Sequence, residues 1–197
     1  TTQSSVTAKN ISVNATDNSS ITGTAAIAGA STQGSAAGLA LVYSSIANNV
    51  SAGVTGSKLT ASGSVAAGAN SNASISTVAV GVAMSSQVGL AGSVATNLMG
   101  TNVTASITAA GTNGVNGADV TATNNVAVIA GNNDKAAVFA GAVSISKGAA
   151  GGAGSLVTNQ ITGTTAAYIN GANTKVDALG TSTTDTLSVN NGTLVHA

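Results

Sequence analysis

The side chains that could perform catalysis are few in this 197-residue chain and lie far apart in the sequence. His196, the only histidine, stands beside the carboxyl-terminal residue, where a frayed and solvated side chain is the ordinary expectation. A nucleophilic triad of histidine, acid and serine cannot be assembled within a stack of repeats from that position. We therefore predict that the chain is not an enzyme and has no catalytic residue or cofactor.

The acidic residues do not have the spacing of a metal site. All five are aspartates: Asp17, Asp119, Asp134, Asp177 and Asp185. None of them follows the pattern of a calcium-binding loop. Residues 148–154 are rich in glycine but lack the Lys-Ser/Thr ending of a phosphate loop, so close packing is the better interpretation of that segment. We expect the aspartates to act in turns and caps and predict no bound metal.

The basic residues do not form a patch either. All five are lysines, mostly in predicted turns: Lys9, Lys58, Lys135, Lys147 and Lys175. A nucleic-acid partner would require clustered positive charge, whereas the formal net charge is zero and only 2% of the residues are aromatic. We predict no nucleic-acid partner and expect the lysines to discourage pairing at strand edges.

Asparagine and threonine patterns suggest two further hypotheses. Sequons occur at Asn10, Asn14, Asn18, Asn49, Asn72, Asn102 and Asn191. Chance alone gives about five in a chain of this composition, so glycosylation stays open. The pairs Thr121/Thr123 and Thr164/Thr165 raise ice binding as a lower-ranked hypothesis, although their spacing does not repeat.

The composition favours a stacked β architecture. Hydrophobic residues make up 43% of the chain and charged residues 5%, with 25 glycines, no proline and no cysteine. A mean hydropathy of +0.37 argues against a disordered chain. No run of about 20 apolar residues predicts a membrane-spanning helix. Small aliphatic side chains and backbone hydrogen bonds must therefore supply the stability.

Three copies of one unit organise the chain. The central copy runs from Ser74 to Ile107 and reads SISTVAVGVAMSSQVGLAGSVATNLMGTNVTASI. Its counterparts begin at Ile21 and Ala137, and their anchor positions correspond as Leu41, Val94 and Leu156; Ser44, Asn97 and Asn159; and Val54, Ile107 and Ile169. Subtraction gives offsets of 53 (94 − 41) and 62 (156 − 94), so the third unit carries a nine-residue insertion. Such a period is typical of stacked supersecondary units.

The central copy contains the clearest strand of the sequence. Val78, Val80, Val82 and Met84 alternate with Ala79, Gly81 and Ala83, which is the period of a β-strand. The second face is so small that another backbone layer could approach closely. Residues 85–89 reverse the chain, and a return strand begins at Leu90. The segment is then either a long flat hairpin or two arms of one solenoid coil, buried between like layers.

We predict an all-β parallel β-helix, or β-solenoid, built from repeats of about 53–62 residues. Residues 1–197 form one domain with units of about 9–58, 59–118, 119–175 and a truncated 176–197. Because coils of about 20 to 25 residues are common, each unit should contain two coils and an excursion. The array starts and stops within a unit, and Thr1 to Gln3 are typical of a cut end. We expect either a piece of a longer stack or copies that stack end to end.

The units, including SISTVAVGVAMSSQVGLAGSVATN and GAVSISKGAAGGAGSLVTNQI, resemble the repeats of leukotoxin-type filamentous adhesins of Gram-negative bacteria. The resemblance covers nearly the whole chain and rests on the Val-x-x-Asn positions, Val94 with Asn97 and Leu156 with Asn159, from which the first unit departs at Ser44. It implies a β-solenoid stalk, exported by a type V route and located outside the cell or on its surface. Host or bacterial glycans or proteins, or neighbouring repeats, would be its partners. The alternative hypothesis is a self-assembling filament subunit.

Overall fold

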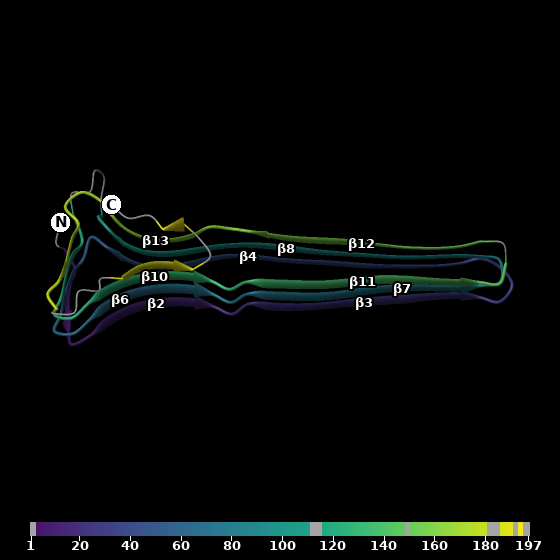
Figure 1. Cartoon of the computed structure of the whole chain (residues 1–197), viewed down its shortest axis with the longest axis horizontal. Helices are drawn as coiled ribbons and strands as arrows, with labels where there is room; N and C mark the ends of the chain where they lie inside the picture. Colours follow the sequence, from purple (N-terminus) through teal and green to yellow (C-terminus); the bar gives the residue numbers. More distant parts are fainter. Residues whose placement is uncertain (1–2, 111–115, 149, 181–185, 191–192, 195–197) are drawn as a thin grey trace.

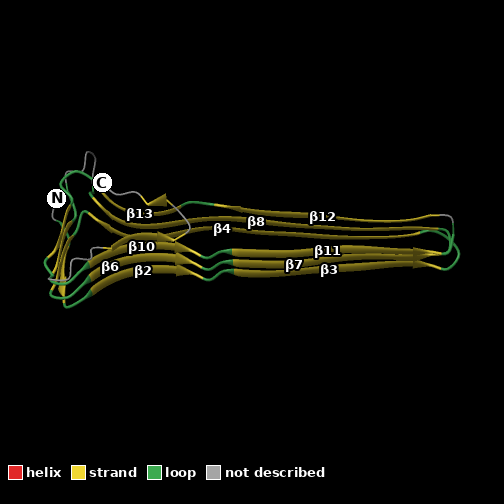
Figure 2. Ribbon diagram, in the orientation of Figure 1, coloured by secondary structure: helices red, strands yellow, loops and turns green. Residues whose placement is uncertain are grey.

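The computed structural model describes residues 3–110, 116–148, 150–180, 186–190 and 193–194. All regular elements in these ranges are β-strands, as Figure 2 shows. Every strand pairing is parallel, and each strand pairs with its counterparts in neighbouring coils. The predicted all-β parallel solenoid is confirmed.

The chain winds through three full coils and a shorter fourth turn. The first coil contains β1 (Ser5–Ala8), β2 (Ile11–Asp17), β3 (Ser20–Ser31) and β4 (Ala36–Thr55). The second contains β5 (Lys58–Ala61), β6 (Val65–Ser71), β7 (Ser74–Ser85) and β8 (Val88–Thr108). The third contains β9 (Asp119–Ala122), β10 (Val126–Asn132), β11 (Lys135–Ser146), β12 (Ala150–Thr162) and β13 (Thr165–Asn170). The fourth contains β14 (Lys175–Ala178), β15 (Thr186–Asn190) and β16 (Thr193–Leu194).

Four sheets run along the stack. Sheet A is β1-β5-β9-β14, sheet B is β2-β6-β10-β15, and sheet C is β3-β7-β11. Sheet D joins β4, β8, β12, β13 and β16. Sheets A and B with the near half of sheet D enclose a three-sided part, here called the body. Sheet C and the far half of sheet D form a two-layered extension, here called the arm (residues 20–47, 74–100 and 135–162), which points away from the body in Figure 1.

The hydrogen-bonding register follows the sequence repeats. Leu41 pairs with Val94, and Val94 pairs with Leu156. Ile107 likewise lies between Val54 and Ile169. One unit of the sequence is therefore one coil, and the expectation of two coils per unit is wrong. The reason is strand length: β8 alone has 21 residues, so a single circuit uses the whole repeat.

Eight (10 − 2) of the nine additional residues lie between β8 and β9, at the end of the second unit (59–118) and not within the third unit. Thr55 and Lys58 are separated by two residues in the first coil, whereas Thr108 and Asp119 are separated by ten, from 109 to 118. The register in β5–β9 and β6–β10 is unchanged by this loop. A loop is tolerated here because it leaves the ladders on both sides of it intact.

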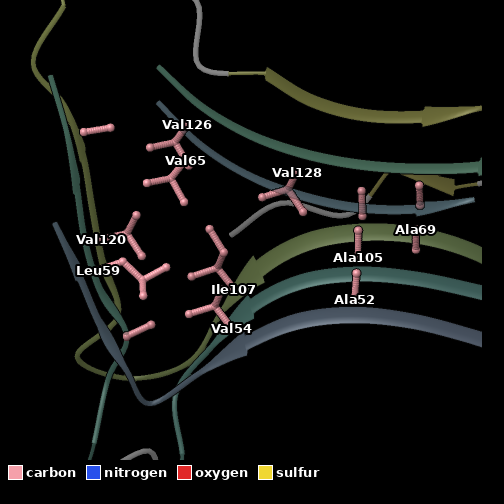
Figure 3. Close-up of a cluster of buried hydrophobic side chains, with 14 of the residues drawn as sticks. Ala52, Val54, Leu59, Val65, Ala69, Ala105, Ile107, Val120, Val126 and Val128 are labelled. Carbon is pink, nitrogen blue, oxygen red and sulfur yellow. The ribbon is translucent and has the colours of Figure 1, made fainter. Parts of the chain in front are cut away.

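The body has an aliphatic core in which like residues stack from coil to coil. Leu59 pairs with Val120, Val65 with Val126, and Val54 with Ile107, and all six side chains are at most 5% exposed. Figure 3 shows these side chains converging from the sheets of the body. Burial of each such side chain contributes about 1.5–3 kcal/mol, which makes the body the best packed part of the protein.

The arm has almost no room between its two layers around Gly81, whereas at its base the larger Ile46, Ile75 and Met99 are buried between them. Ala79 and Ala83 on β7 are fully buried, and a Cβ added at Gly81 would clash with the carbonyl oxygens of Gly92 and Gly38. The predicted close approach of a second backbone layer is confirmed. β7 and β8 belong to different sheets, so they are two successive strands of one solenoid coil and do not form a hairpin.

The segment Ser74–Ile107 lies between its two copies along the stack, as expected, because β7 is flanked by β3 and β11. Its valine face is not buried as expected, however. Val78, Val80 and Val82 are only partly buried and Met84 is 50% exposed. The neighbouring strands β3 and β11 cover the two edges of β7, but no element covers the outer surface of the sheet in the described residues.

The fourth turn has no arm. β15 pairs with β10 and β16 pairs with β13, yet Asn190 and Thr193 are separated by two residues (193 − 190 − 1). The residues of the third coil that pair with them, Gly131 and Ala166, are separated by 34 (166 − 131 − 1), which include β11 and β12. In the described part of the chain, β11 and β12 therefore carry an unpaired upper edge.

Candidate interaction surface

Two of the aspartates are built into the corner where β2, β6 and β10 lead into the arm. Asp17 accepts hydrogen bonds from the Ser19 hydroxyl (2.6 Å) and the Asn48 amide (2.7 Å). Asp134 accepts from the Ser71 hydroxyl (2.6 Å). The Ser19 hydroxyl, assisted by Asn48, lowers the pKa of Asp17 against the opposing effect of burial. These are the turn and capping positions that the sequence predicted.

The other two described aspartates are paired with lysines at the surface of sheet A. Lys58 lies 3.6 Å from Asp119, and Lys175 lies 2.7 Å from Asp177. The hydrogen bond from Lys175 to Asp177 raises the pKa of that lysine. Over the described ranges, no three His, Cys, Asp or Glu side chains lie close enough together to hold a metal ion. The pairs are exposed, so they contribute little to stability.

Asn97 crosses the interior of the arm. It is fully buried on β8, where it accepts a hydrogen bond from the Thr77 hydroxyl (2.9 Å) and donates to the Ala137 carbonyl of the third coil (3.0 Å). Asn159, one coil higher, is exposed and donates to Ala136 of its own coil (3.0 Å). The repeated asparagine thus has a structural role, joining sheets C and D.

The outer surface of sheet D in the arm is apolar toward the tip, and Thr96, Thr158 and Gln160 lie on the same surface nearer the body. Its large side chains come from all three coils and form what we call the Leu face: Leu39, Leu41, Tyr43, Leu90, Val94 and Leu156. Five of the six are 58–66% exposed, whereas their inward neighbours Ala40 and Ala95 are fully buried. Except at its base, where Ile46, Ile75 and Met99 are buried together, the arm thus has small residues inside and large apolar residues outside, the reverse of an ordinary two-layer sandwich.

Leucines on the Leu face lie over glycines of the next coil. A Cβ added at Gly92 would lie 3.0 Å from Leu39 Cδ1, and one at Gly152 would lie 3.2 Å from Leu90 Cδ2. These two leucine side chains thus occupy the space that the glycines leave.

The outer surface of sheet C is also apolar but ends in charge. Phe139, Val143 and Ile145 are 51–59% exposed, and lysines stand at the start of β11 (Lys135) and just after its end (Lys147). Near the arm tip, Met84, Ile145 and Lys147 line part of an open hollow of about 310 Å³. This hollow continues the apolar surface of the sheet.

The sequence interpretation missed the exposure of the Leu face. It recognised a loose alternation of small and apolar residues there but did not decide which set is inside. A usable signal was present: β4, β8 and β12 carry no charged residue, and Leu39 and Leu90 each stand between glycine and alanine. Each strand has one face of large residues and one face of small residues. Where the two layers are so close that only alanine or glycine fits between them, the small face must lie inside and the large face outside.

The remaining candidate residues are not brought together. His196 and Asp185 lie outside the described residues. Thr165 is 5% exposed and directed inward, whereas Thr121 lies in a column with Thr60 and Thr7. A single column is not the repeated array that would favour ice binding, which stays a prediction that thermal hysteresis would test. The five lysines lie at strand ends or in the connections beside them.

The comparisons with known proteins identify no relative. No family model, curated protein or solved structure matches this chain. Within the described ranges, no helix is long and apolar enough to cross a membrane.

Proposed function

We propose that this chain is a non-enzymatic structural segment of a filamentous adhesin, a β-solenoid stalk located outside the cell or on its surface. The observation that supports the proposal best is the unbroken register from coil to coil. β4 pairs with β8 over all 20 of its residues, and β8 continues in register with β12 and β13.

The stack provides rigidity through its backbone. A force along the solenoid axis acts on whole strands at once, because each strand lies across that axis and is hydrogen-bonded along its length. Stacked aliphatic residues in the body stabilise the same coil-to-coil contacts. The exposed polar side chains and loops would supply shallow contacts to glycans or proteins on other surfaces.

The proposed stalk function can be tested by measuring where the protein is located on the cell and what shape it has. Antibodies raised against the chain should label intact cells that produce it, with an antibody against a cytosolic protein as the negative control. Electron micrographs of the released protein should show straight rods. Labelling that requires permeabilised cells, or a far-UV spectrum dominated by helix, would contradict the stalk.

A second candidate function is a filament subunit that stacks head to tail. The edges of β3 and β4 below and of β11 and β12 above are unpaired in the described part of the chain, which favours such contacts. The fourth turn weighs against a continuous stack, because it adds strands to the body but none to the arm. When a second copy stacked on the body, the arms of the two copies would still be separated by the height of one coil. Light scattering that shows growing polymers in the purified chain would favour this candidate.

A further inference from the structure

We propose that the Leu face is a docking surface for the Leu face of a second copy of this chain. The two copies would be related by a two-fold axis that runs along the row Leu41, Val94 and Leu156, with their bodies at opposite ends. The proposal does not depend on the stalk function, since it follows from the surface of the arm alone.

The composition of the Leu face calls for an apolar partner. Leu39, Leu41, Tyr43, Leu90 and Leu156 are each at least 58% exposed, and the three strands that carry them contain no charged residue. Large contiguous apolar patches rimmed by polar residues mark interaction sites on soluble proteins. Polar residues end this patch at the arm tip, where the chain reads Thr32, Gln33 and Gly34.

The area of the face is sufficient for a pair of copies. Three strands spaced by about 4.8 Å, each contributing about 12 residues at about 3.3 Å per residue, cover about 550 Å² per copy. Two such faces bury about 1,100 Å² in total, above the approximately 1,000 Å² expected of a specific interface. Leu39 lies over Gly92 and Leu90 over Gly152, so these leucines occupy space that would otherwise be hollow between two paired faces.

The outer surface of sheet C is less suited to pairing with itself. Lys135 and Lys147 stand at the two ends of β11, so an antiparallel pair of these surfaces would bring like charges together. A lipid bilayer is also a poor partner for the arm. The open edges of β4 and β12 present backbone N–H and C=O groups that hydrocarbon cannot satisfy.

The shape of sheet D sets the orientation. Figure 1 shows β4 and β8 curving away from the opposite sheets at the end of the body that is remote from the arm. If both bodies lay at the same end, these bends would collide. With the bodies at opposite ends, Val94 on the central strand β8 meets its own copy at the axis, and Val88 at the arm tip faces Gly100 of the second copy (94 + 6), at the base of its arm.

Cysteine cross-linking tests this geometry, because the natural chain has no cysteine. Val94→Cys in the full chain should form a disulfide-linked dimer under mild oxidation. Val80→Cys is the matched control, since Val80 is also a partly buried outward valine, on the central strand of sheet C. A dimer from Val80→Cys without one from Val94→Cys would overturn the proposal.

Sedimentation velocity provides the second measurement. The natural chain should dimerise with concentration, and Leu39→Thr/Leu41→Thr should weaken the dimer at least tenfold. Val143→Thr/Ile145→Thr, on sheet C, should leave it unchanged. All four side chains are at least half exposed, so folding of the monomer should persist in both variants, as circular dichroism can verify. A monomer at every concentration overturns the proposal, and so does a monomer that binds lipid vesicles through the Leu face.

Discussion

The side chain of Asn97 on β8 donates a hydrogen bond of 3.0 Å to the carbonyl oxygen of Ala137 on β11, one coil further along the stack. Because Asn97 also accepts from Thr77 on β7, a single amide joins both layers of the arm and two successive coils. Toward the arm tip the interior consists mainly of alanine, glycine and serine, and at the arm base Ile46, Ile75 and Met99 are buried; none of these side chains supplies many directional contacts.

Replacing Asn97 with alanine should destabilise the protein. The change leaves the buried Thr77 hydroxyl without its acceptor, and an unsatisfied buried polar group costs about 1–3 kcal/mol. Urea denaturation of the full chain measures the free energy of unfolding. Asn159→Ala is the control, since its hydrogen bond is exposed and its loss should change stability by less than about 0.5 kcal/mol. Equal effects of the two substitutions would contradict the role given to Asn97.

Glycines on the two faces of the arm should respond in opposite ways to alanine. Gly81→Ala places a methyl group against the carbonyl oxygens of Gly92 and Gly38, so the layers must separate, at a cost of about 3 kcal/mol or more. A Cβ at Gly154 meets nothing within 4 Å. Gly154→Ala should therefore stabilise the folded protein by about 0.4–1 kcal/mol, because alanine lowers the conformational entropy of the unfolded chain. Thermal unfolding followed by circular dichroism compares them. A stable Gly81→Ala variant would mean that the layers are further apart than described.

The body should be more sensitive to truncation than the outer surface of the arm. Ile107→Ala removes a fully buried side chain and should cost about 2–5 kcal/mol. Ile145, of the same type but 52% exposed on β11, is the matched control, and Ile145→Ala should change stability by about 0.5 kcal/mol or less. The free energies of unfolding in urea give both values, and similar losses would contradict the assignment of the core.

Asp17 should make stability depend on pH in the acid range. Its pKa in the folded protein is lowered, so its hydrogen bonds stabilise the fold above the usual carboxyl pKa of about 3.9. That contribution is lost as the pH falls through the folded-state pKa, because the protonated carboxyl no longer favours folding. The difference in stability between the natural chain and Asp17→Asn should therefore shrink from pH 7 to pH 3.

The Asn48→Ala variant is the control for this titration. It removes one donor to Asp17 but keeps the carboxyl group, so the pH-dependent difference should be reduced and not abolished. Urea midpoints at the two pH values provide the measurement. A difference between the natural chain and Asp17→Asn that grows as the pH falls would have the wrong sign for a lowered pKa.

Several features followed from the sequence alone. The correspondence of Leu41, Val94 and Leu156 predicted the rungs, because equivalent residues of a repeat occupy equivalent places in a stack. The alternation from Val78 to Met84 predicted a strand, and the reversal at residues 85–89 agrees with the end of β7 and the start of β8. Local pattern and repeat spacing suffice for such features since each depends on neighbouring residues or on direct copies.

Only the tertiary structure decided how the strands are arranged and which face of each is inside. A period of two separates Val80 from Gly81 but does not say which one faces the interior. That choice depends on the distance between the layers, and contact between Gly81 and the Gly92 backbone leaves room only for small residues. The same packing makes one unit a single coil and leaves Leu41 and its neighbours on the outside. It also gives Asn97 a carbonyl to reach in the next coil, a contact that no single repeat contains.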